Sequence, residues 1–373
     1  MRWSERGRRE DAAKKGTQMQ PETTQPAETG RDTGNGTAKP EIPGGRLLTT
    51  SRLKTEHRCS REQRIKYELG YQPLKDDEGP ARLGTLVHLG LEAWWRWHQC
   101  PDEGTPLAAA ILALPEDADP YERAKARAML LGYDARWRED ADRYEVLGVE
   151  LEFTPAPILN PATGRASRTW LLGGKLDAKV REIATGRMLV VEHKTTSEDM
   201  SAGSDYFKRL KMDSQVSVYT TTTEAVAVLY DVLAKPGQRP SKATPLEAQK
   251  RTKDGRLYAN QREVDETPDE YFVRLVDAIA ESPDRYYARA EVVRFDGEIR
   301  EHMADVWATA ARIRENQIVG AWPRNPEACV RFGRTCPYFA VCCGEASLED
   351  GSLFVRVENA HRELSQPETR TAA

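Results

Sequence analysis

Apolar residues recur every three or four positions in several stretches of the chain, a spacing that predicts helices with one buried face. The clearest case is 81–98, where leucine, valine and tryptophan side chains fall on one helical face. A second, 120–141, is rich in alanine and arginine. Helices are predicted over 60–69, 81–98, 120–141, 205–222, 268–281 and 297–317.

In the middle of the chain the pattern changes to alternating apolar and polar residues and to short apolar runs, both typical of strands. Thr185-Gly186 separates two of these runs and predicts a hairpin. The fold class expected is therefore α/β, with a small mixed sheet flanked by helices and a helical part before it. Strands are predicted over 144–153, 168–180, 187–194, 224–233 and 288–295.

The two ends of the chain differ from its centre in composition. Residues 1–45 have too few large apolar side chains to offset the entropy lost on ordering, so they are predicted to be a disordered leader. One domain is expected over 46–345, followed by a C-terminal tail over 346–373, and 235–266 is predicted to be a long surface loop. Within the domain we expect a helical part over 46–143, a sheet core over 144–295, and a helix with a cysteine cluster over 296–345.

Composition narrows the class of protein further. The 373 residues are 39% hydrophobic and 31% charged. The sequence contains no run of 18 apolar residues, so no membrane-spanning helix is predicted. Nine of the first sixteen residues are charged, and this stretch lacks the apolar core of a secretory signal, so a cytoplasmic location without a membrane partner is expected. A net charge of −4 excludes a uniformly basic nucleic-acid binder, but it allows a local basic groove.

Acidic residues and a lysine coincide on the predicted hairpin. Asp177 lies in its first strand, and Glu192 and Lys194 lie two residues apart in the second, so their side chains share one face. Burying two carboxylates costs free energy unless a cation uses them, and Mg²⁺ prefers such oxygen ligands. The ammonium would orient or help deprotonate a water. An ordinary surface ion pair is equally compatible with this spacing, and His193 is expected on the opposite face in a structural role.

The order of these residues resembles a known family. Gly174-Lys175-Leu176-Asp177 followed by Glu192-His193-Lys194 is similar to the core motif of PD-(D/E)XK nucleases. The resemblance extends over about 46–345 and implies a restriction-endonuclease-like core. It also implies that Asp177 and Glu192 hold Mg²⁺ or Mn²⁺ while Lys194 positions the attacking water.

Further motifs resemble the RecB-like branch of this superfamily. Gly84-Thr85-Leu86-Val87-His88 is similar to the branch's first motif, which implies that His88 completes the metal site; otherwise it would be a core histidine. Gln215 and Tyr219 match a QxxxY pair, which implies contact with DNA or support of the lysine; otherwise they are a helix-surface pair. Glu150 is a weaker candidate for the site, and an exposed strand face is an equal alternative for it.

Four of the six cysteines lie within fifteen residues, which favours a metal site over a disulfide framework in a reducing compartment. Cys329, Cys336 and Cys342 with the distant Cys59 make a four-thiolate set that suits Zn²⁺ or an iron–sulfur cluster. Cys343 is an alternative to Cys342, and buried cysteines without a ligand are the structural alternative. The set resembles the cluster of RecB-like nucleases, including CRISPR-associated exonucleases, which implies a 4Fe–4S cluster, with Zn²⁺ as the lesser possibility.

Together these features predict a metal-dependent DNA nuclease that acts as an exonuclease on single-stranded or end-containing DNA. The resemblance implies a role in phage or bacterial recombination, repair or CRISPR adaptation, with a recombination, helicase or CRISPR protein as partner. The basic segment 235–256 and the tryptophans Trp94, Trp95 and Trp97 are candidate DNA contacts, although such tryptophans more often belong to a core. Two alternatives are a non-catalytic DNA-end-binding protein and a zinc-stapled nucleic-acid-binding protein.

Overall fold

A computed structural model describes 47–74, 80–153, 155–331, 333–361 and residue 364. The predicted leader and the last residues of the predicted tail lie outside the described residues. None of the helices in the described segments carries an apolar stretch that would reach across a bilayer.

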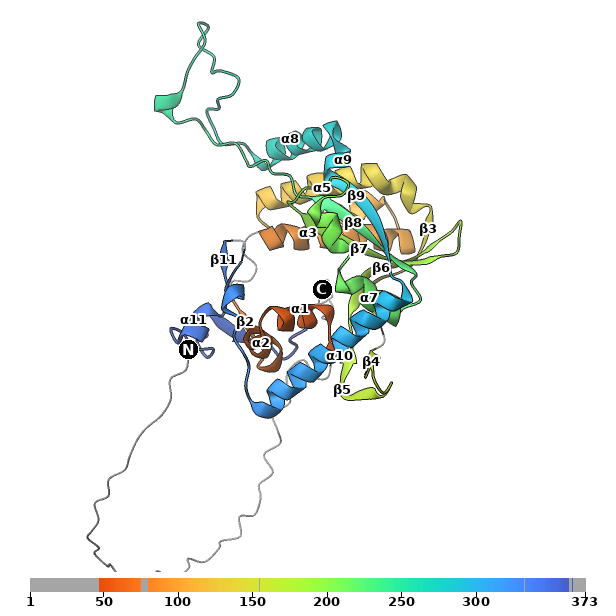
Figure 1. Ribbon diagram of the computed structural model, residues 1–373. Coiled ribbons are helices and arrows are strands. Elements are labelled where there is room, and N and C mark those ends of the chain that lie inside the picture. Colours follow the sequence, from red (N-terminus) through yellow and green to blue (C-terminus); the bar gives the residue numbers. More distant parts are fainter. Residues whose placement is uncertain (1–46, 75–79, 154, 332, 362–363, 365–373) are drawn as a thin grey trace, which may run out of the picture. The chain divides into compact units, whose positions relative to one another are not determined.

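A five-stranded mixed sheet with the order β3-β6-β7-β8-β9 forms the centre of the fold (Figure 1). Only β7 and β8 pair in parallel, and the other neighbours are antiparallel. All residues of β8 except the last are buried, as expected for a strand covered on both faces. The strands are β3 (Tyr144–Glu152), β6 (Lys175–Glu182), β7 (Met188–Thr196), β8 (Ala227–Ala234) and β9 (Tyr287–Val293).

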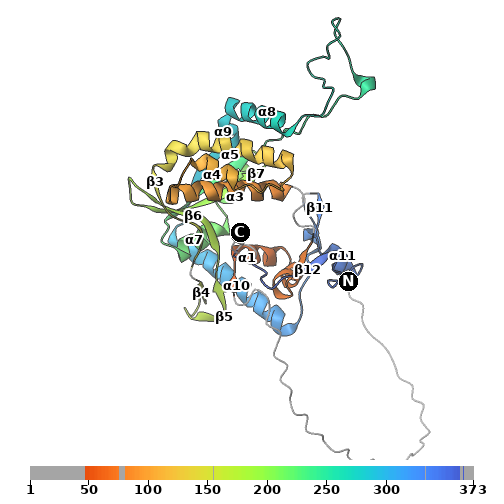
Figure 2. The same cartoon turned by 180° about the vertical axis from the view of Figure 1, so that it is seen from behind.

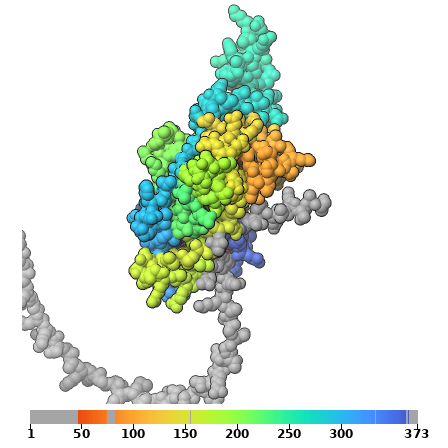
Figure 3. Space-filling view, turned by 90° about the vertical axis from the view of Figure 1, so that its right-hand side faces the viewer, coloured from red at the N-terminus to blue at the C-terminus, as the bar shows by residue number. Residues whose placement is uncertain are grey.

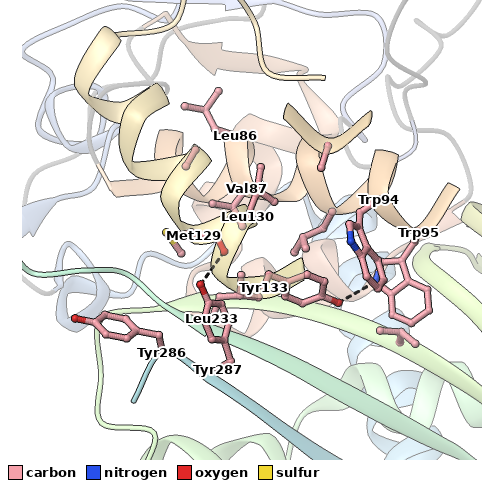
Figure 4. Close-up of a cluster of buried hydrophobic side chains, with 14 of the residues drawn as sticks. Leu86, Val87, Trp94, Trp95, Met129, Leu130, Tyr133, Leu233, Tyr286 and Tyr287 are labelled. Atoms are coloured by element: carbon pink, nitrogen blue, oxygen red, sulfur yellow. Dashed lines mark hydrogen bonds between the residues drawn. The ribbon is translucent and has the colours of Figure 1, made fainter. Parts of the chain in front are cut away.

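Helices α3 and α5 cover one face of this sheet, with α8 packed on α5. Figure 4 shows the cluster that they form, in which Trp95 donates a hydrogen bond to the hydroxyl of Tyr133 and Tyr287 to the carbonyl of Met129. Trp94 and Trp95 are fully buried, so both tryptophans belong to the core and do not present a surface to DNA bases. The helices of this layer are α3 (Pro80–Gln99), α4 (Pro106–Leu112), α5 (Pro120–Ala141), α8 (Pro268–Glu281) and α9 (Pro283–Tyr286).

Helices α7 and α10 cover the opposite face, and α1 packs against both of them (Figure 2). A small sheet, in the order β1-β5-β4, continues this side of the molecule. The elements are α1 (Thr50–Arg58), α6 (Asp205–Leu210), α7 (Ser214–Thr222), α10 (Asp296–Val319), β1 (Leu47–Leu48), β4 (Ala156–Leu159) and β5 (Ala166–Leu172).

Two predicted elements are each divided in the structure. The strand predicted over 168–180 breaks at Gly173-Gly174, so that β5 and β6 belong to different sheets. A Cβ on Gly174 would lie 2.7 Å from the ring of Phe153, which shows how closely the chain passes its neighbour there. The helix predicted over 205–222 ends at Leu210 and restarts after Asp213, whose side chain caps α7 by accepting from the Gln215 amide.

The segment that carries the cysteines consists of short elements, as its sequence predicts. The helix expected over 60–69 is a turn of α-helix followed by a π-helix, and α1 precedes it without having been predicted. Part of the predicted tail is folded, because β12 pairs with β2. The elements are α2 (Ser60–Gln63), η1 (Arg64–Glu68), β2 (Tyr71–Pro73), η3 (Pro326–Ala328), β10 (Val330–Arg331), β11 (Arg334–Thr335), α11 (Phe339–Cys343) and β12 (Phe354–Arg356).

The predicted loop forms an arm that projects beyond α8 (Figure 3). Its two sides are joined by backbone hydrogen bonds, such as that from the Thr244 amide to the Arg262 carbonyl, 2.8 Å long. The arm contains only one short helix, η2 (Leu246–Ala248). The mixed α/β fold predicted from the sequence is confirmed, and the helices predicted over 120–141 and 268–281 have the predicted bounds.

The close packing of α3 on α5 depends on Gly90. A Cβ there would lie 2.3 Å from Cδ1 of Leu130. We expect Gly90→Val to lower the free energy of unfolding by about 1–3 kcal/mol, because the added atoms overpack the core. Thermal or urea unfolding measures the change. Gly297→Val is the control, since no atom lies within 4 Å of a Cβ at that position; equal losses in the two variants would contradict the packing argument.

Candidate active site

A cleft of about 730 Å³ lies where β6 and β7 meet α3 and α7. It contains side chains from both helical layers, and residues at the start of α1 form part of its wall. Of the residues predicted for the site, all but the lysine line this cleft: His88, Glu150, Asp177, Glu192, Gln215 and Tyr219.

The two predicted metal-binding carboxylates lie on adjacent strands. Ala178 of β6 pairs with Val191 of β7, so Asp177 and Glu192 are the next residues along the two strands. Glu192 is only 4% exposed. Burial, followed by the charge of Asp177, raises the pKa of Glu192 above its ordinary value.

Three donors hold the Glu192 carboxylate. Lys194 Nζ donates to Oε1 at 2.5 Å, Gln215 Nε2 donates to the same oxygen at 2.7 Å, and the Tyr219 hydroxyl lies 3.0 Å from Oε2. The Gln215 Oε1 atom also accepts from Lys194 Nζ at 2.9 Å. Gln215 and Tyr219 therefore contact the glutamate, and Gln215 also contacts the lysine. The resemblance implied either contact with DNA or support of the lysine.

The lysine is held as an ammonium. Burial by itself lowers the pKa of Lys194, but the charges of Glu192 and Asp177 outweigh it and raise the pKa overall. A charged Lys194 is suited to bind a phosphate oxygen or orient a water, since all three of its hydrogens are donors.

Asp177 is held from the other side by histidine. The backbone amide of His193 donates to Asp177 Oδ2 at 2.7 Å, and the Nδ1 atoms of His193 and His88 lie 3.4 and 3.9 Å from the same oxygen. Burial raises the pKa of Asp177, but its bond to His193 and the charges around it lower the pKa overall. Burial lowers the pKa of His88 to about 4, so its imidazole is neutral and able to bind a metal.

His193 occupies the opposite face of β7 from Glu192, as its place in the strand predicted, but it also contacts Asp177. Its side chain is 3% exposed and lies between Asp177 and Asp231, with its Nε2 atom 3.9 Å from Asp231 Oδ2. Asp231 in turn accepts hydrogen bonds from Tyr133 at 2.5 Å and from Arg289 at 3.1 Å. Asp231 was not predicted for the site, although an acidic residue within the apolar run 225–233 was a usable signal.

Glu150 reaches the cleft from β3 through an unusual backbone conformation. It is the one non-glycine residue with positive φ in the described part of the chain, at +54°. It stands opposite Asp177, between the pairs Val149–Ala178 and Leu151–Leu176, and its carboxylate pairs with Lys175. A left-handed conformation costs about 1–2 kcal/mol for such a residue, and strained positions of this kind occur often in functional sites.

The four predicted cysteine ligands lie around a separate cavity of about 450 Å³. Cys59 comes from the junction of α1 and α2, and Cys329, Cys336 and Cys342 come from the C-terminal elements. Cys343 lines the same cavity. Burial raises the pKa of Cys336 to about 11. Among the residues that the structure describes, no group of three or more His, Cys, Asp or Glu side chains is placed so that it could hold a metal ion, at this cavity or in the cleft.

Comparison with known proteins identifies the family. A sequence model of the PD-(D/E)XK nuclease superfamily matches 47–343. The chain belongs to this superfamily. The predicted resemblance is confirmed at that level, and the match contains every predicted site residue from Cys59 to Cys342.

Two solved structures are similar to this PD-(D/E)XK chain. The crystal structure of SSO0001 is 15% identical with a TM-score of 0.27, over 71% of this chain and 86% of the other. A phage-related exonuclease from Haemophilus somnus 129PT is 10% identical with a TM-score of 0.30, over 74% of this chain and 96% of the other. A search of curated proteins finds no match.

The strain at Glu150 is testable by comparing two substitutions. We expect Glu150→Gly to be more stable than Glu150→Ala by about 1 kcal/mol, because both lose the ion pair and only glycine adopts positive φ without strain. At Glu152, which has no positive φ, the order should be reversed. Urea unfolding of the four variants measures both differences, and the same order at both positions would contradict a strained backbone at Glu150.

Proposed function

We propose that this PD-(D/E)XK protein is a metal-dependent deoxyribonuclease that hydrolyses phosphodiester bonds as an exonuclease at DNA ends. The observation that carries the proposal is that Asp177 and Glu192 line one cleft from adjacent strands, with Lys194 bonded to the second carboxylate. Membership of a nuclease superfamily supports it.

The donor set of the cleft fits a hard divalent cation. Asp177 and Glu192 would hold Mg²⁺ or Mn²⁺ through carboxylate oxygens, and His88 would complete the site. Two buried carboxylates repel each other, and a cation between them would offset that repulsion. When bound, the metal would supply Lewis-acid stabilisation of the charge that develops on the phosphate.

The chain's own residues would position the other reactants. Lys194 is fixed by Glu192 and Gln215, so its ammonium would orient the attacking water or bind a phosphate oxygen without losing side-chain freedom during the reaction. Tyr219 would keep Glu192 in place through its hydroxyl. Gln215 and Tyr219 lie one helical turn apart on α7, and both side chains contact Glu192 in the middle of β7.

The order of the elements supports a place in the RecB-like branch. His88 on α3 precedes the sheet, and the Gln215–Tyr219 pair on α7 follows β7, as the branch's motifs require. The proposed substrate is single-stranded or end-containing DNA in phage or bacterial recombination, repair or CRISPR adaptation. A recombination, helicase or CRISPR protein would be the partner, and the proposed location is cytoplasmic.

The nuclease activity is tested with end-labelled single- and double-stranded DNA in Mg²⁺, Mn²⁺ or EDTA. We expect metal-dependent digestion by the wild-type protein, and a loss of at least about a hundredfold in Asp177→Ala, Glu192→Ala and Lys194→Ala because each removes charge at the reacting phosphate. DNA binding should persist in all three. Glu145→Ala is the control, since this exposed carboxylate of β3 pairs with Arg181; full activity in the three site variants would overturn the assignment.

We also propose that Cys59, Cys329, Cys336 and Cys342 hold a 4Fe–4S cluster. All four line one cavity, which meets the need of such a cluster for four thiolates. Zn²⁺ is the lesser alternative, because it also accepts four thiolates. Either group would connect Cys59, which precedes the sheet in the sequence, to the three cysteines that follow the sheet. It would therefore stabilise the fold much as a long-loop crosslink does.

The cluster is tested by the colour and iron content of protein purified without oxygen. We expect a brown wild-type protein, and a colourless Cys336→Ser variant with a melting temperature lower by several degrees, because the crosslink is lost. Cys100→Ser should keep the colour, since Cys100 is exposed and does not line the cavity. A colourless wild-type protein that contains zinc would replace the iron–sulfur assignment with the zinc one.

A further inference from the structure

A second and larger cleft, of about 1010 Å³, lies beyond the carboxyl ends of the parallel strands β7 and β8. Residues that directly follow these strands form part of its wall, and α5 supplies another part. Gly84 and Thr195 line the active-site cleft, whereas Lys235 lines this one. A Cβ on Gly84 would lie 3.0 Å from Thr195 Oγ1 and 3.8 Å from Lys235 Nζ, so the two clefts adjoin at Gly84.

Four basic side chains line this second cleft, and one of them, Arg285, comes from α9. Lys125 reaches it from α5, and Lys235 and Arg239 come from the segment after β8. Burial and the charge of Lys125 lower the pKa of Lys235, and the charge of Lys235 contributes to the low pKa of His88 in the active site. Because Lys235 Nζ would lie 3.8 Å from a Cβ on Gly84, which lines the catalytic cleft, this basic side chain reaches the edge of that cleft.

The two lysines are held in place by the fold. Lys125 Nζ donates to the carbonyl of Pro236 at 2.8 Å, and the backbone amide of Lys235 donates to the carbonyl of Thr196 at 2.7 Å. Both side chains are half-buried. Like charges kept together on a rigid, partly desolvated wall form a preorganised site for an anion.

Three of the four acidic residues that line the same cleft have cationic partners outside it. Glu122 pairs with Arg82, and Glu198 pairs with Arg209 at 2.6 Å. A third, Asp284, pairs with Arg136 at 2.7 Å, and Asp199 accepts from the amide and hydroxyl of Ser201. These arginines do not line the cleft, so they offset the charge of these three carboxylates from outside it.

We propose that Lys235 and Lys125 bind an internal backbone phosphate of the DNA strand, next to the phosphodiester that is cut. The inference rests on the proposed nuclease function and adds the course of the strand, from the active-site cleft past Gly84 into the second cleft. Gly84 suits this course because a side chain there would crowd Thr195, whose Oγ1 atom would lie 3.0 Å from the added Cβ. Phosphate contacts of this kind fix the register of a strand without reading its sequence.

The proposal is tested by binding of a labelled 12-nucleotide single strand in EDTA, where no cleavage takes place. A series of oligonucleotides carries one neutral methylphosphonate at each position in turn. Wild-type protein should bind about tenfold more weakly at one or two adjacent positions, because the neutral group cannot form a charge-assisted hydrogen bond there. Lys235→Gln and Lys125→Gln should bind the unmodified strand about tenfold more weakly than the wild-type protein does. A methylphosphonate at the sensitive positions should then lower the affinity of these variants little further. The slope of log affinity against log salt concentration should become shallower by about 0.7 for each phosphate that the variant no longer neutralises.

The control is Lys208→Gln, which removes the same charge from an exposed lysine that pairs with Asp205 on α6. It should keep the wild-type methylphosphonate pattern, and thermal unfolding should show that all three variants are folded. If the wild-type protein cuts DNA but Lys235→Gln and Lys125→Gln keep the wild-type pattern, or respond only to a terminal phosphate, this inference is wrong and the nuclease function stands. If the wild-type protein neither binds nor cuts DNA, the nuclease function itself fails.

Discussion

The arrangement of this protein depends on two carboxylates, Asp177 and Glu192, that lie side by side near the centre of a sheet. Such a pair is costly because each charge loses water and repels the other. The cost is offset from two sides, by donors on Lys194 and α7 for Glu192 and by the amide of His193 for Asp177. These donors therefore stabilise the charges of the two carboxylates. The repulsion that remains between Asp177 and Glu192 leaves the cleft suited to a cation.

The strand β7 connects this site to both helical layers through the alternation of its side chains. Glu192 and Lys194 face α7, whereas His193 between them faces the layer of α3 and α5. There it lies close to Asp231, which Tyr133 and Arg289 hold by hydrogen bonds. A buried polar network of this kind favours one arrangement of its members, because any shift would leave a desolvated group without its partner. The geometry of Asp177 is thus coupled to the packing of α5.

The parts of the fold that the sequence predicted are those set by local spacing. The period of two in β7 placed Glu192 and Lys194 on one face, and the period of 3.6 gave the bounds of α5 and α8. What local spacing lacks is information on contacts between distant segments. It did not separate β5 from β6, because that break depends on the passage of Gly174 beside Phe153. Nor did it bring together Lys125 and Lys235, since only the packing of α5 on the strand ends makes them neighbours.

The helix α1 shows how the two proposed metal centres are related physically. Thr50 and Ser51 at its start line the active-site cleft, and Cys59 directly after its end lines the cysteine cavity. Nine residues of helix span about 13 Å, so the two cavities are joined by one short rigid element. The buried Arg52 fixes this helix by pairing with Glu68, which also accepts from Gln317 of α10. Whatever orders the cysteines therefore also orders one wall of the catalytic cleft, because α1 cannot move at one end without moving at the other.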